Sequence, residues 1–220
     1  MAGEVRVNGQ VVRKCSVPVA EDDLVEVAGR PRFVSRGGEK LEGAFAAWPG
    51  WRVEGHVCLD VGASTGGFTD CLLQHGARRV FAIDVGTNQL AWKIRADPRV
   101  WARENFNARY LAPADLPETP TRAVTDVSFI SLRLILPPMA AVLAPGGEMV
   151  SLVKPQFEAG RDLVRGGVVK DDRVRRQVLA DMLDFGQTAL SLEVLGSVES
   201  PLPGKDKGNV EFLVWWRKGA

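Results

Sequence analysis

Cysteine and histidine are scarce in this sequence, which has three cysteines and two histidines among 220 residues. The cysteine number is odd and no C-x-x-C pair occurs, so we expect neither a disulfide framework nor a cysteine zinc site. Cys58 lies in an apolar run and Cys71 begins one, and both are expected to be buried thiols. With only His56 and His75 as imidazole donors, the sequence predicts no metal centre.

Long apolar runs are also missing. No stretch approaches the ~20 residues that cross a bilayer, and the N-terminal sequence MAGEVRVNGQ has no apolar signal-peptide core. The cytoplasm is therefore the expected location.

Positive and negative charges are nearly balanced, because the sequence has 28 Lys and Arg and 27 Asp and Glu. This balance excludes a strongly basic coat protein but not a local basic surface, since binding depends on where charges lie.

The rest of the composition is ordinary for a globular chain, with 45% hydrophobic and 25% charged residues.

Residues 1–29 alternate apolar and polar side chains and carry Asn8-Gly9, a strong hairpin signal, so they predict a small β unit. Residues 30–33 predict a short, stiff linker because they contain Pro31. From residue 34 to 220, helical and apolar strand patterns alternate. This order predicts an α/β domain with a mostly parallel sheet, helices on both faces and a C-terminal antiparallel hairpin.

Proline positions set two details of the expected helices. Residues 88–97 predict a helix that stops before Pro98. Residues 132–147 predict a helix that Pro137 and Pro138 interrupt.

A run of small residues follows the first predicted strand of the large domain, reading DVGASTGGF from Asp60 to Phe68. Small side chains let a ligand approach the backbone, and the following helix offers N–H donors at its start. The spacing fits neither the dinucleotide G-x-G-x-x-G motif nor a G-K-[ST] phosphate loop. A carboxylate at Asp60 instead suits a cofactor with an ammonium group, such as S-adenosylmethionine.

Two further residues fit a nucleoside cofactor. Asp84 ends the next strand, where a carboxylate can accept hydrogen bonds from ribose hydroxyls. Asn105 follows the third strand and is a candidate for adenine contact, with a turn residue as the alternative. The expected cofactor-binding residues are Asp60, Gly62, Ser64, Thr65, Gly66, Gly67, Phe68, Asp84, Val85 and Asn105.

Four charged residues lie near the expected ligand crevice. Asp126 and Lys154 end the fourth and fifth strands, and the carboxyl ends of strands form the crevice of an open α/β sheet. Lys40 lies in the helix before the first strand, and Glu211 lies early in the last strand. A surface salt bridge is the alternative role for each residue.

The segments SRGGEKL, LDVGASTGGFTD, DVSFISL, LVKPQFE, GGVVKD and KGNVEFL run in order through nearly the whole chain. As a set they resemble the TlyA family of FtsJ-like RNA ribose methyltransferases, some of whose members carry the name haemolysin. The resemblance implies a Rossmann-like class I methyltransferase fold with a seven-stranded sheet. It also implies S-adenosylmethionine as cofactor and 2′-O-methylation of ribosomal RNA, typically at cytidine.

The family's Lys-Asp-Lys-Glu tetrad corresponds by motif to Lys40, Asp126, Lys154 and Glu211. We assign Lys154 to activation of the ribose hydroxyl and Lys40 to holding the adjacent phosphate or ribose. The two carboxylates would orient the ammonium groups.

Residues 2–28 resemble the second half of an S-four-type RNA-binding domain, a module whose first half consists of two basic helices. We therefore expect residues 1–29 to be a partial module of this type. Arg6, Arg13 and Lys14 are candidate phosphate contacts, with a solvated hairpin face as the alternative. Arg36 is a stronger candidate for RNA contact because it lies four residues before Lys40.

Three other functions compete with RNA 2′-O-methylation. A methyltransferase for another substrate is disfavoured because N-methylation needs no pair of lysines. A membrane-acting haemolysin lacks support from any amphipathic or spanning segment. The third alternative is an RNA-binding or ribosome-assembly protein that binds the cofactor without turnover. Ribosomal RNA or ribosomal subunits are the expected partners, and the sequence leaves the oligomeric state open.

Overall fold

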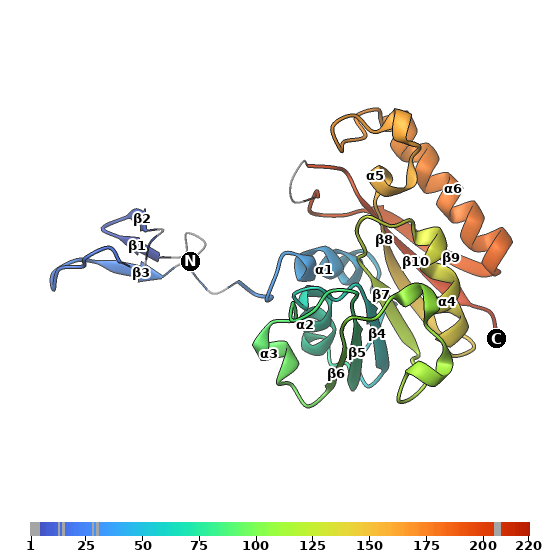
Figure 1. Cartoon of the computed structure of the whole chain (residues 1–220), viewed down its shortest axis with the longest axis horizontal. Coiled ribbons are helices and arrows are strands. Elements are labelled where there is room, and N and C mark those ends of the chain that lie inside the picture. Colours follow the sequence, from blue (N-terminus) through green and yellow to red (C-terminus); the bar gives the residue numbers. More distant parts are fainter. Residues whose placement is uncertain (1–4, 13, 15, 28, 30, 205–207) are drawn as a thin grey trace. The chain divides into compact units, whose positions relative to one another are not determined.

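The computed structural model describes residues 5–12, 14, 16–27, 29, 31–204 and 208–220. The chain divides into two compact units, Met1–Arg32 and Phe33–Ala220 (Figure 1). Each unit is described by itself below.

The smaller unit is an antiparallel three-stranded sheet with the order β2-β1-β3. Its strands are β1 (Val5–Val7), β2 (Gln10–Val12) and β3 (Val25–Val27). The expected hairpin turn is confirmed, since Asn8 and Gly9 have φ angles of 51° and 77° and Val7 pairs with Gln10. The Asn8 side chain donates to Asp23 Oδ1 at 2.7 Å and accepts from the Leu24 N–H at 2.9 Å. These bonds tie the loop before β3 to the hairpin.

The larger unit contains a seven-stranded sheet with the order β6-β5-β4-β7-β8-β10-β9. Its strands are β4 (Val57–Val61), β5 (Arg79–Ile83), β6 (Val100–Arg103), β7 (Arg122–Thr125), β8 (Glu148–Val153), β9 (Leu192–Glu199) and β10 (Phe212–Lys218). Strands β4 to β8 are parallel, and β10 runs antiparallel to both β8 and β9. The expected Rossmann-like sheet with its antiparallel hairpin is confirmed. The strand order reverses between β4 and β7, which places a ligand crevice at their carboxyl ends.

Helices cover both faces of this sheet (Figure 1). One face carries α1 (Gly37–Ala47), α2 (Gly67–Gln74) and α3 (Trp92–Arg95), and the other carries α4 (Leu136–Val142) and α6 (Asp172–Leu190). Short helical turns make up the rest: α5 (Pro155–Glu158), η1 (Ala108–Tyr110), η2 (Pro113–Asp115), η3 (Leu132–Leu134) and η4 (Arg161–Leu163). Two apolar cores result, one on each side of the sheet, and every residue of β4 is buried between them.

Two expected helices differ from the prediction. The helix expected over 88–97 is shortened to α3, because the backbone before Trp92 is not helical: Asn88 has a φ of 55° and Ala91 a ψ of 139°. The N–H groups of Gln89 and Leu90 in this segment donate to the Glu104 carboxylate. The prolines expected to interrupt a helix lie instead in the first turn of α4, after the separate turn η3. A proline costs little there, because the first N–H groups of a helix have no intrahelical partner.

Phe33 also differs from its expected place in a linker. Its side chain is buried in the core of the larger unit, against the start of α1. A Cβ atom on Gly38 would lie 2.3 Å from Phe33 Cγ, so only glycine lets the ring pack here. Among the described residues, no helix is long and apolar enough to cross a membrane.

Candidate active site

A cavity of about 680 Å³ lies at the carboxyl ends of the central strands. The start of α1, the loop after β4, the segments after β7 and β8, and the segment before β10 all contribute to its lining. The side chains that matter most to the chemistry are Arg36, Lys40, Asp126, Ser128, Phe129, Lys154, Gln156 and Glu211. All four residues of the predicted tetrad therefore face one cavity.

Lys154 and Asp126 form one ion pair, in which the lysine is buried and the aspartate half-buried. Lys154 follows β8 with extended backbone angles, as expected for a residue before proline. Its Nζ lies 2.6 Å from Asp126 Oδ1 and donates to Ser128 Oγ at 2.8 Å. Two contacts from the segment after β7 thus fix the lysine head group.

Lys40 and Glu211 form the second buried pair. Lys40 Nζ donates to Glu211 Oε2 at 2.5 Å, and the two side chains are 10% and 2% exposed. Gln156 Nε2 reaches the other oxygen, Oε1, at 3.4 Å. The site therefore balances two ammonium groups with two carboxylates, which removes the penalty of an unpaired buried charge.

Glycine in the loop after β4 brings these groups close together. Gly62 has a φ of 84°, and a Cβ atom there would lie 2.9 Å from the backbone oxygen of Asp126. A Cβ atom on Gly67 would lie 2.2 Å from Ser35 Oγ and 2.9 Å from the Gly38 nitrogen. Both positions need glycine because the loop touches the tetrad segments at backbone distance. The turn continues through Ser64, Thr65 and Gly66, and Ser64 and Gly66 have positive φ angles of 48° and 92°. Phe68 follows in the first turn of α2.

Asp60 is fully buried in β4, beneath the loop. Its Oδ2 accepts from Thr69 Oγ1 at 2.6 Å, whereas its Oδ1 has no hydrogen-bond partner among the residues that the structure describes. Burial raises the pKa of Asp60 to about 7. A buried carboxylate oxygen without a partner suits a site that receives a cationic ligand.

Asp84 ties the loop to the end of β5. Its Oδ2 accepts from the Ser64 N–H at 2.7 Å, and its Oδ1 accepts from the Gly86 N–H at 2.6 Å. Val85 is 70% exposed, and exposed Asn105 has a φ of 55° and donates its N–H to the Gly86 oxygen at 2.9 Å. The three residues lie together beside the loop, at the ends of β5 and β6, rather than in the lining of the tetrad cavity.

The predicted RNA contacts lie in different units. Arg36 is exposed, lines the cavity and precedes the first residue of α1. Arg6 is exposed in β1 opposite Glu26, and Lys14 is exposed after β2. Arg13 lies outside the described residues.

The lining residues that were not predicted include Ser128, Phe129 and Gln156. Phe129 is 91% exposed, has a φ of 63° and lies with its ring centroid 5.2 Å from that of Phe157. Bulky residues rarely adopt this backbone conformation, and residues that do so cluster at active sites and ligand-binding segments. Phe129 belongs to the segment DVSFISL, but the sequence does not reveal that its side chain is exposed, because phenylalanine is usually buried.

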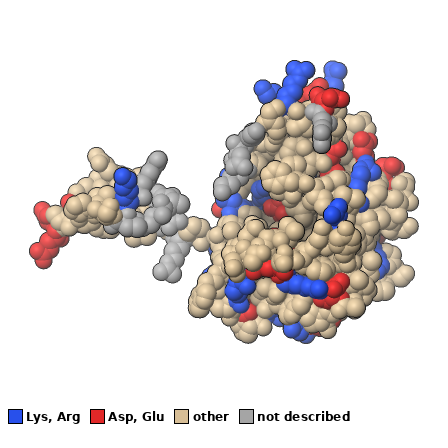
Figure 2. Space-filling view, viewed as in Figure 1, with Lys and Arg blue, Asp and Glu red and all other residues tan. Residues whose placement is uncertain are grey.

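Several basic side chains of the larger unit form ion pairs. Arg95, Arg99 and Arg103 contact Glu104, Asp97 and Asp115 at 2.6 to 2.8 Å. On the face shown in Figure 2, blue and red groups alternate over the larger unit. Of the basic residues that line the cavity, Lys40 and Lys154 are ion-paired, whereas the described residues supply no ion pair for Arg36.

Comparison with known proteins places the chain in a family. A family model described as FtsJ-like methyltransferase matches residues 33–218. The Bacillus subtilis protein named "Putative rRNA methyltransferase YqxC" is 48% identical, over 97% of this chain and 76% of its own length. The 16S/23S rRNA (cytidine-2'-O)-methyltransferase TlyA of Mycobacterium tuberculosis is 42% identical, over 98% of this chain and 81% of its own length.

A solved structure agrees with these relatives. The crystal structure of a "putative hemolysin" from Lactococcus lactis has a TM-score of 0.83 and 49% identity, and the match covers 86% of this chain and 90% of the other. The matched region spans the glycine loop and every tetrad segment. The chain belongs to the FtsJ-like methyltransferase family.

Proposed function

We propose that this protein methylates the 2′-hydroxyl of a ribose, typically of a cytidine, in ribosomal RNA, with S-adenosylmethionine as the methyl donor. One observation carries the proposal: a single cavity is lined both by the glycine loop and by both lysine–carboxylate pairs. The names of relatives such as TlyA, an rRNA (cytidine-2'-O)-methyltransferase, support this substrate class. This activity would be located in the cytoplasm with the ribosome.

The loop side of the cavity suits the cofactor. When bound, S-adenosylmethionine supplies an electrophilic methyl group on a sulfonium. The partnerless Oδ1 of Asp60 is the group that would attract its ammonium. Asp84 fixes the loop through Ser64 and Gly86, and each of its oxygens keeps a second lone pair for a ribose hydroxyl. Val85 and Asn105 would border the adenine.

The tetrad side suits the nucleophile. An ammonium has three N–H donors. Those of Lys154 contact Asp126 and Ser128, so one donor remains for a substrate hydroxyl. Lys154 activates the hydroxyl by stabilising the negative charge that develops on its oxygen, and the Asp126 carboxylate offers a proton acceptor beside it. Proton transfer of this kind contributes about 10²- to 10⁴-fold, and alignment of the hydroxyl with the methyl carbon contributes much of the rest.

The remaining residues position the RNA. Lys40, held by Glu211, and exposed Arg36 lie where a phosphate next to the target ribose would reach the cavity. Phe129 offers an exposed aromatic face at the same cavity, suited to stacking on an unpaired base. We further propose that residues 1–29 act as a partial S-four-type RNA-binding domain, joined by residues 30–33 to a methyltransferase domain over 34–220.

The test is methyl transfer from labelled S-adenosylmethionine to ribosomal subunits and to naked ribosomal RNA. Lys154→Met should lower the rate at least about 100-fold, because it removes the activating group, and should leave cofactor affinity unchanged. The control is Arg176→Met, which removes an exposed positive charge on α6 outside the lining of the cavity and should keep full activity. Full methyl transfer by Lys154→Met with normal cofactor binding would falsify the assignment.

The binding-only alternative has its own outcome in this assay. If the wild-type protein binds S-adenosylmethionine but labels neither subunits nor naked RNA, a ribosome-assembly role without turnover replaces the proposed function.

A further inference from the structure

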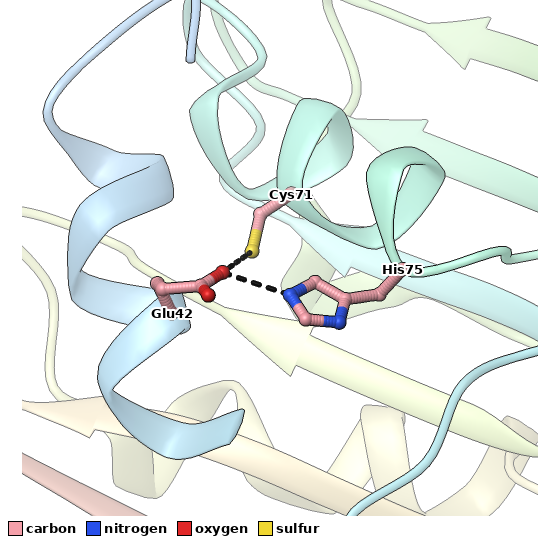
Figure 3. A group of neighbouring side chains, drawn as sticks. All are labelled: Glu42, Cys71 and His75. Atoms are coloured by element: carbon pink, nitrogen blue, oxygen red, sulfur yellow. Dashed lines mark hydrogen bonds and ion pairs between the residues drawn. The ribbon is translucent and has the colours of Figure 1, made fainter. Parts of the chain in front are cut away.

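A second cluster of reactive side chains lies away from the tetrad, between α1 and α2. Glu42 comes from α1, Cys71 comes from α2, and His75 is the residue directly after α2. Figure 3 shows the Glu42 carboxylate facing both the Cys71 thiol and the His75 imidazole. Glu42 Oε2 lies 2.8 Å from His75 Nε2 and 3.7 Å from Cys71 Sγ, and one ligand atom from each residue lies within 4.8 Å of the others.

The donor set matches the preferences of zinc. Zn²⁺ binds thiolate sulfur at about 2.3 Å and imidazole nitrogen or carboxylate oxygen at about 2.0–2.2 Å, in a tetrahedron. These bond lengths place ligand atoms about 3.4–3.6 Å apart along the edges of the tetrahedron. The sulfur–oxygen distance of 3.7 Å is already close to this value. The nitrogen–oxygen distance of 2.8 Å needs to lengthen by roughly 0.6 Å to reach the shorter of these values.

Packing holds the three donors in place. The His75 ring stacks on Phe45 of α1, with centroids 3.6 Å apart and planes 4° apart. Cys71 is fully buried, whereas the side chains of Glu42 and His75 are each 28% exposed. An ion can therefore reach the cluster past the two exposed ligands, and a water molecule can supply the fourth position.

We propose that Glu42, Cys71 and His75 form a Zn²⁺ site that links α1 to α2. The sequence predicted no metal centre, because the ligands are separated along the chain and only helix packing brings them together. Glu42 lies two residues after Lys40, and α2 begins in the glycine loop. A bound ion would thus stabilise the contact between the helix that carries a tetrad lysine and the loop expected to hold the cofactor.

The experiment measures metal binding by the full chain after treatment with a chelator and dialysis. One equivalent of Zn²⁺ should bind, and Co²⁺ in its place should give a thiolate-to-metal charge-transfer band. Cys71→Ser and His75→Gln should each weaken Zn²⁺ binding by at least about 10- to 100-fold, the range seen when even an outer-shell partner of a metal site is lost. Zn²⁺ should raise the melting temperature of the wild-type protein but not that of either variant.

Matched controls use the other histidine and the other described cysteine. His56→Gln and Cys58→Ala should bind Zn²⁺ as the wild-type protein does, because neither residue belongs to the cluster. Melting curves in chelator establish that each variant is folded, and Glu42→Gln replaces any variant that is not. The proposal is wrong if the wild-type chain binds no stoichiometric Zn²⁺, or if the cluster variants bind it as tightly as the controls do. The cluster is then only a Glu42–His75 pair with a neighbouring thiol.

Discussion

Replacing Glu211 by glutamine removes one partner of the most buried ion pair in the site. The carboxylate is 2% exposed and receives the Lys40 ammonium at 2.5 Å, and the lysine side chain is only 10% exposed. After Glu211→Gln, Lys40 keeps a neutral amide in place of its counter-charge. An ammonium left without a counter-charge in a buried position is strongly destabilising, because desolvation is no longer offset by Coulomb attraction.

The expected loss follows from this burial. Breaking a buried pair from one side costs about 3–5 kcal/mol of unfolding free energy. The surface pair between Arg78 and Glu118 supplies the contrast, since its side chains are 57% and 33% exposed. Glu118→Gln should cost only about 0–1 kcal/mol, the range for solvent-screened pairs.

Urea unfolding followed by tryptophan fluorescence measures both values. All six tryptophans belong to the larger unit, so the signal reports on this unit. The double variant Lys40→Met with Glu211→Leu should recover most of the stability lost in Glu211→Gln, because no unpaired charge remains, but it should not methylate RNA. A Glu211→Gln protein no less stable than Glu118→Gln would refute the argument from burial.

Three further predictions concern single residues. Because burial raises the pKa of Asp60 to about 7, the folded chain retains a proton there between about pH 4 and 7 that the unfolded chain releases. The Asp60 contribution to the free energy of unfolding therefore falls as pH rises through this window. In urea unfolding, the stability of Asp60→Asn relative to wild type should be higher at pH 8 than at pH 5. Phe129→Ala should weaken RNA binding about 5- to 150-fold, which corresponds to the loss of one base–aromatic stack. The melting temperature should not change, because the ring is 91% exposed. Unchanged RNA affinity in a filter-binding assay would exclude stacking. Gly186→Ala should lower stability by about 1–3 kcal/mol, because its Cβ atom would lie 2.2 Å from Cζ3 of the buried Trp216, and an unchanged urea midpoint would contradict this tight packing.

Local patterns were enough to predict most of the fold. Apolar runs of strand length alternate with helical stripes, and this alternation specifies a parallel sheet covered on both faces. The Asn8-Gly9 turn was equally local, because it depends on which residues tolerate positive φ angles. Predictions failed where tertiary contacts override local preference, as before α3, where Asn88 has a φ of 55° and the N–H groups of Gln89 and Leu90 donate to the distant Glu104 carboxylate.

The candidate site divides in the same way. The sequence by itself predicted the glycine loop and, through its resemblance to the TlyA family, the members of the tetrad, because each belongs to a short segment with its own residue pattern. It did not determine the pairing, in which Lys40 contacts a carboxylate 171 residues away and Lys154 contacts Asp126. Nor did it determine that Phe129 would be exposed at the cavity, or that Glu42 would meet Cys71 and His75. Those juxtapositions depend on how helices and strands pack in three dimensions, where residues far apart in the chain become neighbours and burial sets the strength of their charges.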